Sequence, residues 1–123
     1  MEDQYKSFLE DFQGIAYRMD PFWKPVFFHG AVYQITGYNE NDFLHLNPDW
    51  YDIVYPDDLP ELKQKYKSRE FRKPGYKAQR EYRILTKTGD QRWINDSIQS
   101  VFDESGNLVY IDCLLYTSPS PRD

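Results

Sequence analysis

The spacing of hydrophobic and polar positions changes at about residue 77, where mixed and helical patterns give way to three strand-like runs. Residues 77–86, 91–102 and 108–115 are rich in β-branched and aromatic side chains. The two breaks between these runs hold Gly beside Asp or Asn, residue types that tolerate the positive φ of tight turns. The pattern therefore predicts three antiparallel strands joined by two short turns.

The residues before this meander predict the remaining strands and several short helices. Residues 15–19 alternate in polarity, as a half-buried strand does, and residues 24–29 predict a second strand after an Asp-Pro turn. Residues 31–36 predict a short helix that ends at Gly37, a residue type common just past a helix C-terminus. A further short helical turn is expected to carry Phe43.

A longer helix is expected after the Tyr-Pro-Asp-Asp sequence that ends at Asp58. Asp57 is the expected N-cap, and the helix is expected to continue to residue 69 or 71 with one narrow apolar edge. The helices would cover one face of a five-stranded antiparallel sheet. The fold class predicted is therefore α+β.

The N-terminal residues 2–12 have the pattern of an amphipathic helix. Their apolar positions recur at i, i+3, i+4 and i+7, namely at Tyr5, Phe8, Leu9 and Phe12. Such a helix either packs on its own domain or pairs with a second chain, and the pattern is the same for both uses. We therefore separate residues 1–13 as a flanking helix.

Composition narrows the class of protein. A chain of 123 residues is expected to form one domain, and an aromatic content of 18% argues against disorder despite a mean hydropathy of −0.82. The net charge of −5 disfavours nucleic acid as a partner. The sequence has neither an apolar run long enough to span a membrane nor a signal-peptide pattern. We expect a soluble, cytoplasmic domain without membrane insertion, and its single cysteine, Cys113, cannot form an internal disulfide.

Asp96 is the one acidic residue expected on the apolar face of the second meander strand, which it shares with Ile94 and Ile98. A polar residue in such a place is either paired across strands or set against a polar ligand. A small enzyme could use Asp57, Asp58 or Asp96 together with His29. However, the sequence shows no nucleophile–base spacing, phosphate-binding glycine loop or metal quartet, which argues against catalysis and against a metal site. A lone histidine such as His29 more commonly bonds a backbone carbonyl.

Several short motifs, in this order and spacing, resemble a PAS (Per-Arnt-Sim) sensor domain of the type found in archaeal and bacterial signalling proteins. The resemblance covers about residues 14–115. It is carried by Gly-Ile-Ala-Tyr-Arg at 14–18, Val-Phe-Phe-His-Gly-Ala at 26–31, Ile-Thr-Gly-Tyr at 35–38, Asp42 and Phe43, Trp50, Ile-Val-Tyr-Pro-Asp-Asp at 53–58, Glu-Tyr-Arg at 81–83, Thr-Gly-Asp at 88–90, Arg-Trp-Ile at 92–94 and Ser-Gly-Asn at 105–107.

The resemblance implies a sensory and dimerisation module rather than a catalyst. It would belong to a larger signal-transduction protein, such as a sensor histidine kinase or a cyclic-dinucleotide enzyme, whose output domain lies outside this chain. A change induced by a ligand or a partner would pass through the sheet. A homodimer formed through the flanking helix and the sheet is expected. The alternative is a protein–protein interaction module that binds no ligand.

Members of this family hold haem, flavin, a small metabolite or nothing between the helices and the sheet. Covalent flavin chemistry needs a cysteine in the helical section, whereas Cys113 falls in the last strand. Haem usually needs a histidine on the long helix, where none occurs. No cofactor is predicted, and non-covalent flavin or a small organic ligand remains open. Face parity and family position together suggest as pocket walls Phe28, Ile35, Phe43, Ile53, Tyr82, Ile84 and Ile98.

The C-terminal residues 116–123 form a separate segment. Their Ser- and Pro-rich string looks like translated sequencing-adapter read-through, and the alternative is a genuine linker. Two prolines in a Ser-rich run cannot join a strand ladder, so we expect this tail to be disordered. The expected organisation is a flanking helix at 1–13, a PAS domain at 14–115 and the tail at 116–123.

Overall fold

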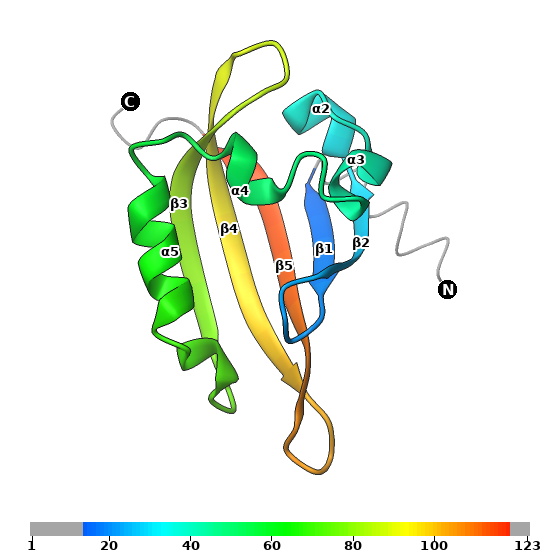
Figure 1. The fold of residues 1–123 in the computed structure, drawn as a ribbon, viewed down its shortest axis with the longest axis vertical. Helices are drawn as coiled ribbons and strands as arrows, with labels where there is room; N and C mark the ends of the chain where they lie inside the picture. The colour runs from blue at the N-terminus through cyan, green and yellow to red at the C-terminus, as the bar shows by residue number, and fades with distance from the viewer. Residues whose placement is uncertain (1–13, 119–123) are drawn as a thin grey trace.

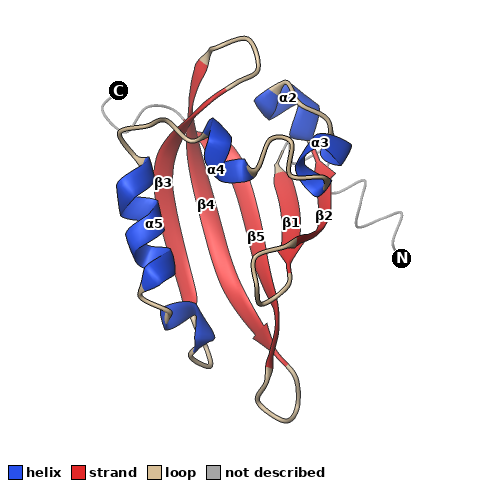
Figure 2. Ribbon diagram, in the orientation of Figure 1, coloured by secondary structure: helices blue, strands red, loops and turns tan. Residues whose placement is uncertain are grey.

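A five-stranded antiparallel sheet carries all the helices of residues 14–118 on one face (Figures 1 and 2). The computed structural model describes these residues, with the backbone alone at 65–67. This is the predicted α+β arrangement. The elements, in chain order, are β1 (Ile15–Met19), β2 (Pro25–Gly30), α2 (Val32–Thr36), α3 (Glu40–Leu44), α4 (Trp50–Ile53), α5 (Leu59–Lys67), the 3-10 helix η1 (Glu70–Arg72), β3 (Lys77–Leu85), β4 (Gln91–Phe102) and β5 (Leu108–Ser118).

The strand order in the sheet is β2-β1-β5-β4-β3, so the last strand of the chain lies at its centre. β5 pairs with β1 over Ile15–Met19 and with β4 along nearly its whole length. The first and last strands must therefore meet before the sheet is complete. Such long-range pairing follows from sheet order and cannot be found from local pattern.

The two meander turns have the expected residue chemistry. At the β3–β4 turn the Thr86 N–H donates to the Asp90 carbonyl over 2.8 Å, and Gly89 has a φ of 91°. At the β4–β5 turn the Asp103 N–H donates to the Asn107 carbonyl over 2.9 Å. A three-residue hairpin loop with glycine at positive φ fixes the pairing register of its strands. The three predicted strands are thus confirmed.

Gly30 ends β2 where the chain passes into the helical layer. Its φ is 104°, and a Cβ at this position would collide with the Gly14 carbonyl oxygen. That carbonyl accepts the Ala31 N–H at 2.9 Å, which closes the junction between β1 and the start of α2. Only glycine combines this positive φ with so close a backbone approach.

The longer helix differs from its expected bounds at both ends. Asp57 is not its N-cap, because the Asp58 N–H donates to the Tyr55 carbonyl at 2.9 Å and places Asp57 inside a turn. The helix therefore begins at Leu59. It ends at Lys67, before Arg69 adopts a left-handed φ of 61°. A left-handed residue cannot continue a right-handed helix.

β5 extends three residues beyond the expected end at Leu115. Tyr116, Thr117 and Ser118 pair with Asn95, Ile94 and Trp93 of β4. The expectation that the disordered tail begins at residue 116 is therefore wrong for residues 116–118, because β4 offers them a ladder partner. Residues 119–123 and the expected N-terminal helix lie outside the described residues.

The core lies between the helices and the inner face of the sheet. Alternation along the strands places Tyr82 and Ile84 of β3, Ile94 and Ile98 of β4, and Ile111 of β5 on that face, each no more than 3% exposed. Within residues 14–118, no helix is long and apolar enough to cross a membrane.

Candidate functional site

A buried polar cluster lies within the apolar inner face of the sheet. Asp96 of β4 stands directly opposite Arg80 of β3 in the strand register. Its Oδ2 accepts hydrogen bonds from Arg80 Nη2 at 2.7 Å, from the Tyr82 hydroxyl at 2.6 Å and from the Tyr17 hydroxyl at 3.4 Å. We call Tyr17, Trp50, Arg80, Tyr82 and Asp96 the aspartate cluster. It joins β1, β3 and β4 through one carboxylate.

Burial controls the electrostatics of the aspartate cluster. Asp96 is completely buried, and the Arg80 side chain is 9% exposed. Burial alone would lower the pKa of Arg80, but the Asp96 carboxylate beside it raises that pKa overall. Burial, and then the charge of Asp96, raise the pKa of Tyr17 and of Tyr82, so both phenols stay neutral donors.

The aspartate cluster is also connected to the helical layer. Trp50, the first residue of α4, donates from its indole Nε1 to the Tyr82 hydroxyl at 2.9 Å. The rings of Trp50 and Tyr17 lie 5.8 Å apart. A movement of α4 would therefore alter the hydrogen bonds that connect β3 with β4.

A cleft of about 430 Å³ opens beside the aspartate cluster, between the sheet, the β1–β2 turn and the helices α4 and α5. We call it the inner cleft. Its walls are mainly aromatic and aliphatic, and three cationic residues and one acidic residue line it. The lining residues are Tyr17, Met19, Phe22, Trp23, Lys24, Leu46, Asp49, Trp50, Tyr51, Leu62, Lys63, Arg80 and Tyr82. Partial burial raises the pKa of Asp49. Concave, largely apolar sites with a few polar groups are typical of small-molecule binding.

The rim of the inner cleft has an unusual backbone. Trp23 and Leu46 have φ values of 66° and 58°, a region that bulky residues rarely adopt. Phe22 and Leu46 are exposed over 75% and 50% of their surface. Backbone strain and exposed apolar side chains are both more frequent at functional sites than elsewhere on a protein surface.

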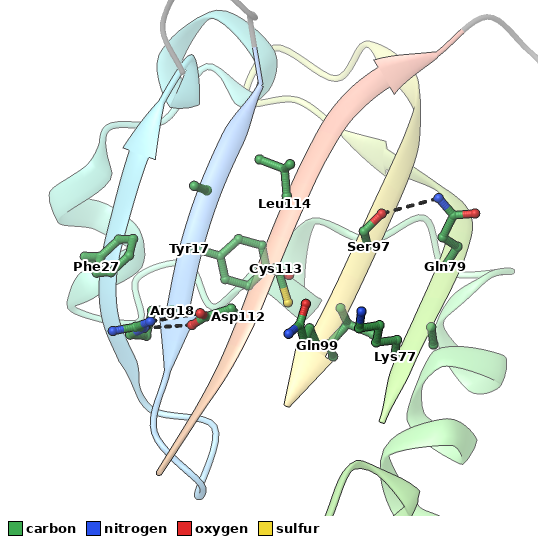
Figure 3. A pocket seen from close by; sticks show the side chains of 13 residues that line it. Tyr17, Arg18, Phe27, Lys77, Gln79, Ser97, Gln99, Asp112, Cys113 and Leu114 are labelled. Atoms are coloured by element: carbon green, nitrogen blue, oxygen red, sulfur yellow. Dashed lines mark hydrogen bonds and ion pairs between the residues drawn. The ribbon is translucent and has the colours of Figure 1, made fainter. Parts of the chain in front are cut away.

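A second hollow, of about 700 Å³, lies on the face of the sheet away from the helices. Figure 3 views the sheet from this side, with the strand order reversed relative to Figure 1. Arg18 and Asp112 form a bidentate ion pair across it, at 2.7 and 2.9 Å. Phe27 and Leu114, which is 39% exposed, provide apolar surface beside them. We call this surface the outer hollow.

The predicted pocket walls are divided between these places. Tyr82 lines the inner cleft. Ile98, although it belongs to the inner face of the sheet, also borders the outer hollow. The other five are core residues no more than 4% exposed, and none of them lines either hollow: Phe28, Ile35, Phe43, Ile53 and Ile84. Their role as walls of a ligand site stays a prediction.

Sequence reasoning missed Arg80 and Tyr17, the partners of Asp96. The signal for Arg80 was present, because a residue two positions before Tyr82 must share its strand face. Of the two readings of Asp96, pairing across strands is the one that the structure bears out. The contact with Tyr17 depends on β1 lying near β4 and had no local signal.

Neither His29 nor Cys113 belongs to the inner cleft. The His29 ring stacks on Phe27 at 4.9 Å, and its buried Nδ1 has no hydrogen-bond partner among the described residues. Cys113 is buried in β5, and burial raises the pKa of its thiol. Within residues 14–118, no group of three potential metal ligands comes together.

Asp58, the residue before α5, anchors the beginning of that helix to β3. Its carboxylate accepts the Arg83 backbone N–H at 2.8 Å and both Nε and Nη2 of the Arg83 side chain, at 2.9 and 2.8 Å. The Arg83 guanidinium also lies 4.2 Å from the centre of the Tyr55 ring. Asp58 is thus a structural residue that bonds across to the sheet, and its hydrogen bonds to Arg83 hold the pKa of its carboxyl below the usual value.

Replacing Asp58 with Asn is expected to lower the free energy of unfolding at neutral pH by about 1 kcal/mol, because solvent screens this partly exposed pair. Since the pKa of folded Asp58 lies below 3.8, its contribution is present above that value and is lost as the pH falls through the folded-state pKa. Urea unfolding at a series of acid pH values measures both effects. The stability curves of the two proteins should converge at the acid end.

The control for this experiment is Asp57→Asn, which removes the same charge from the exposed neighbouring position. It is expected to change the free energy of unfolding by less than about 0.5 kcal/mol. A difference between wild type and Asp58→Asn that is constant down to the lowest pH would contradict a charge-based role for Asp58.

Comparison with known proteins identifies the family to which this antiparallel α+β sandwich belongs. Residues 25–115 match the family described as PAS fold. The match covers well over half of the chain, so the chain belongs to the PAS fold family. The family is generally sensory and non-catalytic.

The chain is also similar to individual proteins. It is 28% identical over 110 residues to the "Methyl sulfide methyltransferase-associated sensor" of Methanosarcina acetivorans, a match that covers 88% of this chain and 11% of that protein. It therefore spans about a tenth of that relative. Two solved structures share the fold at 17% identity. One is the N-terminal domain of a diguanylate cyclase with PAS/PAC sensor from Marinobacter aquaeolei (TM-score 0.71, covering 85% of this chain and 94% of that one). The other is a domain of a putative light and redox sensing histidine kinase from Haloarcula marismortui (TM-score 0.72, 95% and 99%).

Proposed function

We propose that this chain is the sensory and dimerisation module of a larger signal-transduction protein, a sensor histidine kinase. A ligand in the inner cleft, or a bound partner, changes the sheet, and the change passes to an output domain outside this chain. The family membership and the similarity to a sensor of which the chain spans 11% support this function. The observation that carries it is the aspartate cluster, because the cleft shares Tyr17, Trp50, Arg80 and Tyr82 with it.

Transmission would begin at α4 and the cleft and continue through Asp96. A ligand that shifts Trp50 or Arg80 alters the hydrogen bonds that converge on Asp96 Oδ2. Those bonds connect β3 and β4 with β1. Asp96 also stands opposite Leu115 of β5, the strand from which the chain would continue to its output domain. A ligand acts only if it binds one arrangement of these bonds more tightly than another.

The dimer would form through the outer hollow together with the flanking segment 1–13. The outer hollow combines exposed apolar surface at Leu114 with the Arg18–Asp112 ion pair, a mixture common in protein interfaces. The sequence pattern of residues 2–12 supplies an apolar stripe that could pack against this face. Sheet face and flanking segment would thus form one continuous interface.

The test of the ligand branch is native mass spectrometry with an absorbance spectrum of the purified chain. A copurified small molecule that is released on unfolding is expected. A colourless protein whose native mass equals that of the polypeptide alone would overturn the proposal that the chain binds a ligand. The proposal that it acts through a bound protein partner would remain.

The test of the dimer is sedimentation velocity of the whole chain, of a chain that begins at residue 14, and of Leu114→Arg. Both changes are expected to shift the protein toward monomer. Tyr33→Arg, which alters an exposed aromatic residue of α2 away from the outer hollow, should leave the oligomeric state unchanged. Unchanged sedimentation of both the chain that begins at residue 14 and Leu114→Arg would contradict dimerisation through this surface.

The second candidate function is a protein–protein interaction module without a ligand. The larger volume of the outer hollow, about 700 Å³, is the observation that favours it. Native mass spectrometry distinguishes the two functions, since only a ligand-binding sensor is expected to retain a small molecule.

A further inference from the structure

We propose that β3 pairs edge to edge with β3 of a second copy of this chain, antiparallel and about a two-fold axis at Gln79. The contact would join two five-stranded sheets into one continuous sheet. It goes beyond the proposed function, because it adds an interface that uses backbone groups at the side of the sheet. Three features carry it: the outward backbone groups of β3, the short length of its open edge and the order of charges along that edge.

β3 pairs with β4 alone, so its other side is an edge of the sheet (Figure 1). In antiparallel strands, alternate residues turn their backbone N–H and C=O groups toward the same neighbour. The Thr86 N–H bonds the Asp90 carbonyl at the β3–β4 turn, so the even-numbered residues of β3 face β4. The odd-numbered residues therefore turn their backbone groups to the open side, namely Lys77, Gln79, Glu81, Arg83 and Leu85.

The chain itself closes only one end of this edge. The Arg83 carbonyl accepts the Tyr55 N–H at 2.8 Å, and the Arg83 N–H donates to a carboxylate of the same segment, also at 2.8 Å. Among the described residues, no hydrogen bond reaches the outward backbone groups of Lys77, Gln79 or Glu81. Unpaired edge groups are a template for a further strand. The open edge thus runs from Lys77, where β3 begins, to Glu81.

The side chains along the open edge favour a second copy as the partner. Lys77, Gln79 and Glu81 are exposed, and Figure 3 shows the first two on the outer face of the sheet. When two copies pair antiparallel about Gln79, Lys77 of each copy stands opposite Glu81 of the other. Opposite charges in directly opposed positions stabilise a strand pair, and like charges destabilise it. Parallel pairing in register would instead oppose lysine to lysine and glutamate to glutamate.

The backbone selects the same axis. Antiparallel residues whose N–H and C=O groups point at each other exchange two hydrogen bonds, and an axis at Gln79 gives every open residue such a partner. An axis one residue earlier would place Glu81 opposite Gly75, before the strand begins. An axis one residue later would place Lys77 opposite Arg83, which has the same charge and whose backbone groups are already bonded. Two copies paired about Gln79 form a closed two-fold contact.

The test is the rate of amide exchange with solvent, measured by NMR on the ¹⁵N-labelled chain from about 10 μM to about 1 mM. A dissociation constant as weak as about 1 mM leaves about half of the chains paired at the higher concentration. We therefore expect the amides of Lys77, Gln79 and Glu81 to exchange at least about twofold more slowly there. Thr88, in the exposed β3–β4 turn, should exchange at one rate throughout. The same result is expected in Leu114→Arg, which alters the outer hollow and leaves β3 unchanged.

Charge variants test the register. Lys77→Glu should remove the slowing, because it opposes like charges at both ends of the contact, and Lys77→Glu with Glu81→Lys should restore it. Lys87→Glu makes the same charge change in the exposed β3–β4 turn and should behave as wild type. Gln79→Pro removes an outward N–H without removing a bond to β4, so it should also abolish the slowing. The charge variants keep the proposal testable if the proline variant does not fold.

Exchange along the open edge that does not change with concentration up to about 1 mM would overturn edge pairing. Equal slowing in wild type and in Lys77→Glu would overturn the two-fold register at Gln79. Failure of the double charge variant to restore the slowing lost in Lys77→Glu would overturn the pairing of opposite charges. Each of these results would leave the sensor function and the outer-hollow dimer standing, since neither depends on the backbone edge of β3.

Discussion

Replacing Asp96 with Ala is expected to lower the free energy of unfolding by about 3–5 kcal/mol, one of the two largest effects that we predict for this chain. The change leaves the buried guanidinium of Arg80 without its counter-charge. It also removes the acceptor of the Tyr82 and Tyr17 hydroxyls. Urea unfolding monitored by circular dichroism measures the loss.

The matched control is Asp112→Ala, which breaks a bidentate arginine pair in the same sheet. Arg18 and Asp112 are 31% and 36% exposed, so solvent screens their attraction and the expected cost is below about 1 kcal/mol. Replacing both charges of the buried pair, as Arg80→Met with Asp96→Leu, should recover most of the stability lost in Asp96→Ala. If Asp96→Ala cost no more than Asp112→Ala, the aspartate cluster would not be the buried charge network that its geometry indicates.

Replacing Phe43 with Ala is the second large effect, at about 3–5 kcal/mol of unfolding free energy. Phe43 of α3 is 1% exposed, and its ring lies 5.2 Å from the ring of Phe28 and 5.4 Å from that of Trp50. The substitution would leave a cavity where the helical layer meets β2, and it would remove a support of Trp50. Thermal and urea unfolding both report the change.

Tyr33→Ala is the control, because it removes a ring of similar size that is 64% exposed. Its cost is expected to stay within about 0.5 kcal/mol. A cost for Phe43→Ala of the same size would mean that the layer relaxes around the missing ring.

The strand pairing of the meander could be read locally, because alternation sets the two faces of each strand and glycine marks each turn. The predicted β4, at residues 91–102, coincides with the observed Gln91–Phe102. The exact register depended on whether the first turn has three or four loop residues. The observed loop places Arg80 opposite Asp96, whereas a loop one residue longer would have moved Arg80 to a different partner.

The end of β5 shows how pairing overrides composition. A Ser- and Pro-rich ending favours a disordered tail, yet Tyr116, Thr117 and Ser118 continue the strand. Residues 93–95 of β4 pair with β3 on one side, and on the other side their remaining backbone groups pair with β5. Satisfying these groups favours extension of the strand.

The sequence by itself determined the number of strands, the turns of the meander, the amphipathic faces and the resemblance to PAS domains. All of these depend on residues close together in the chain. Only the tertiary structure decided that Tyr17, Trp50, Arg80 and Tyr82 gather around Asp96 and that an aromatic cleft opens beside them. The physical reason is that these contacts join β1, α4, β3 and β4 across long stretches of chain. The contact of Tyr17 with Asp96 also requires β1 and β4 to lie on either side of the last strand.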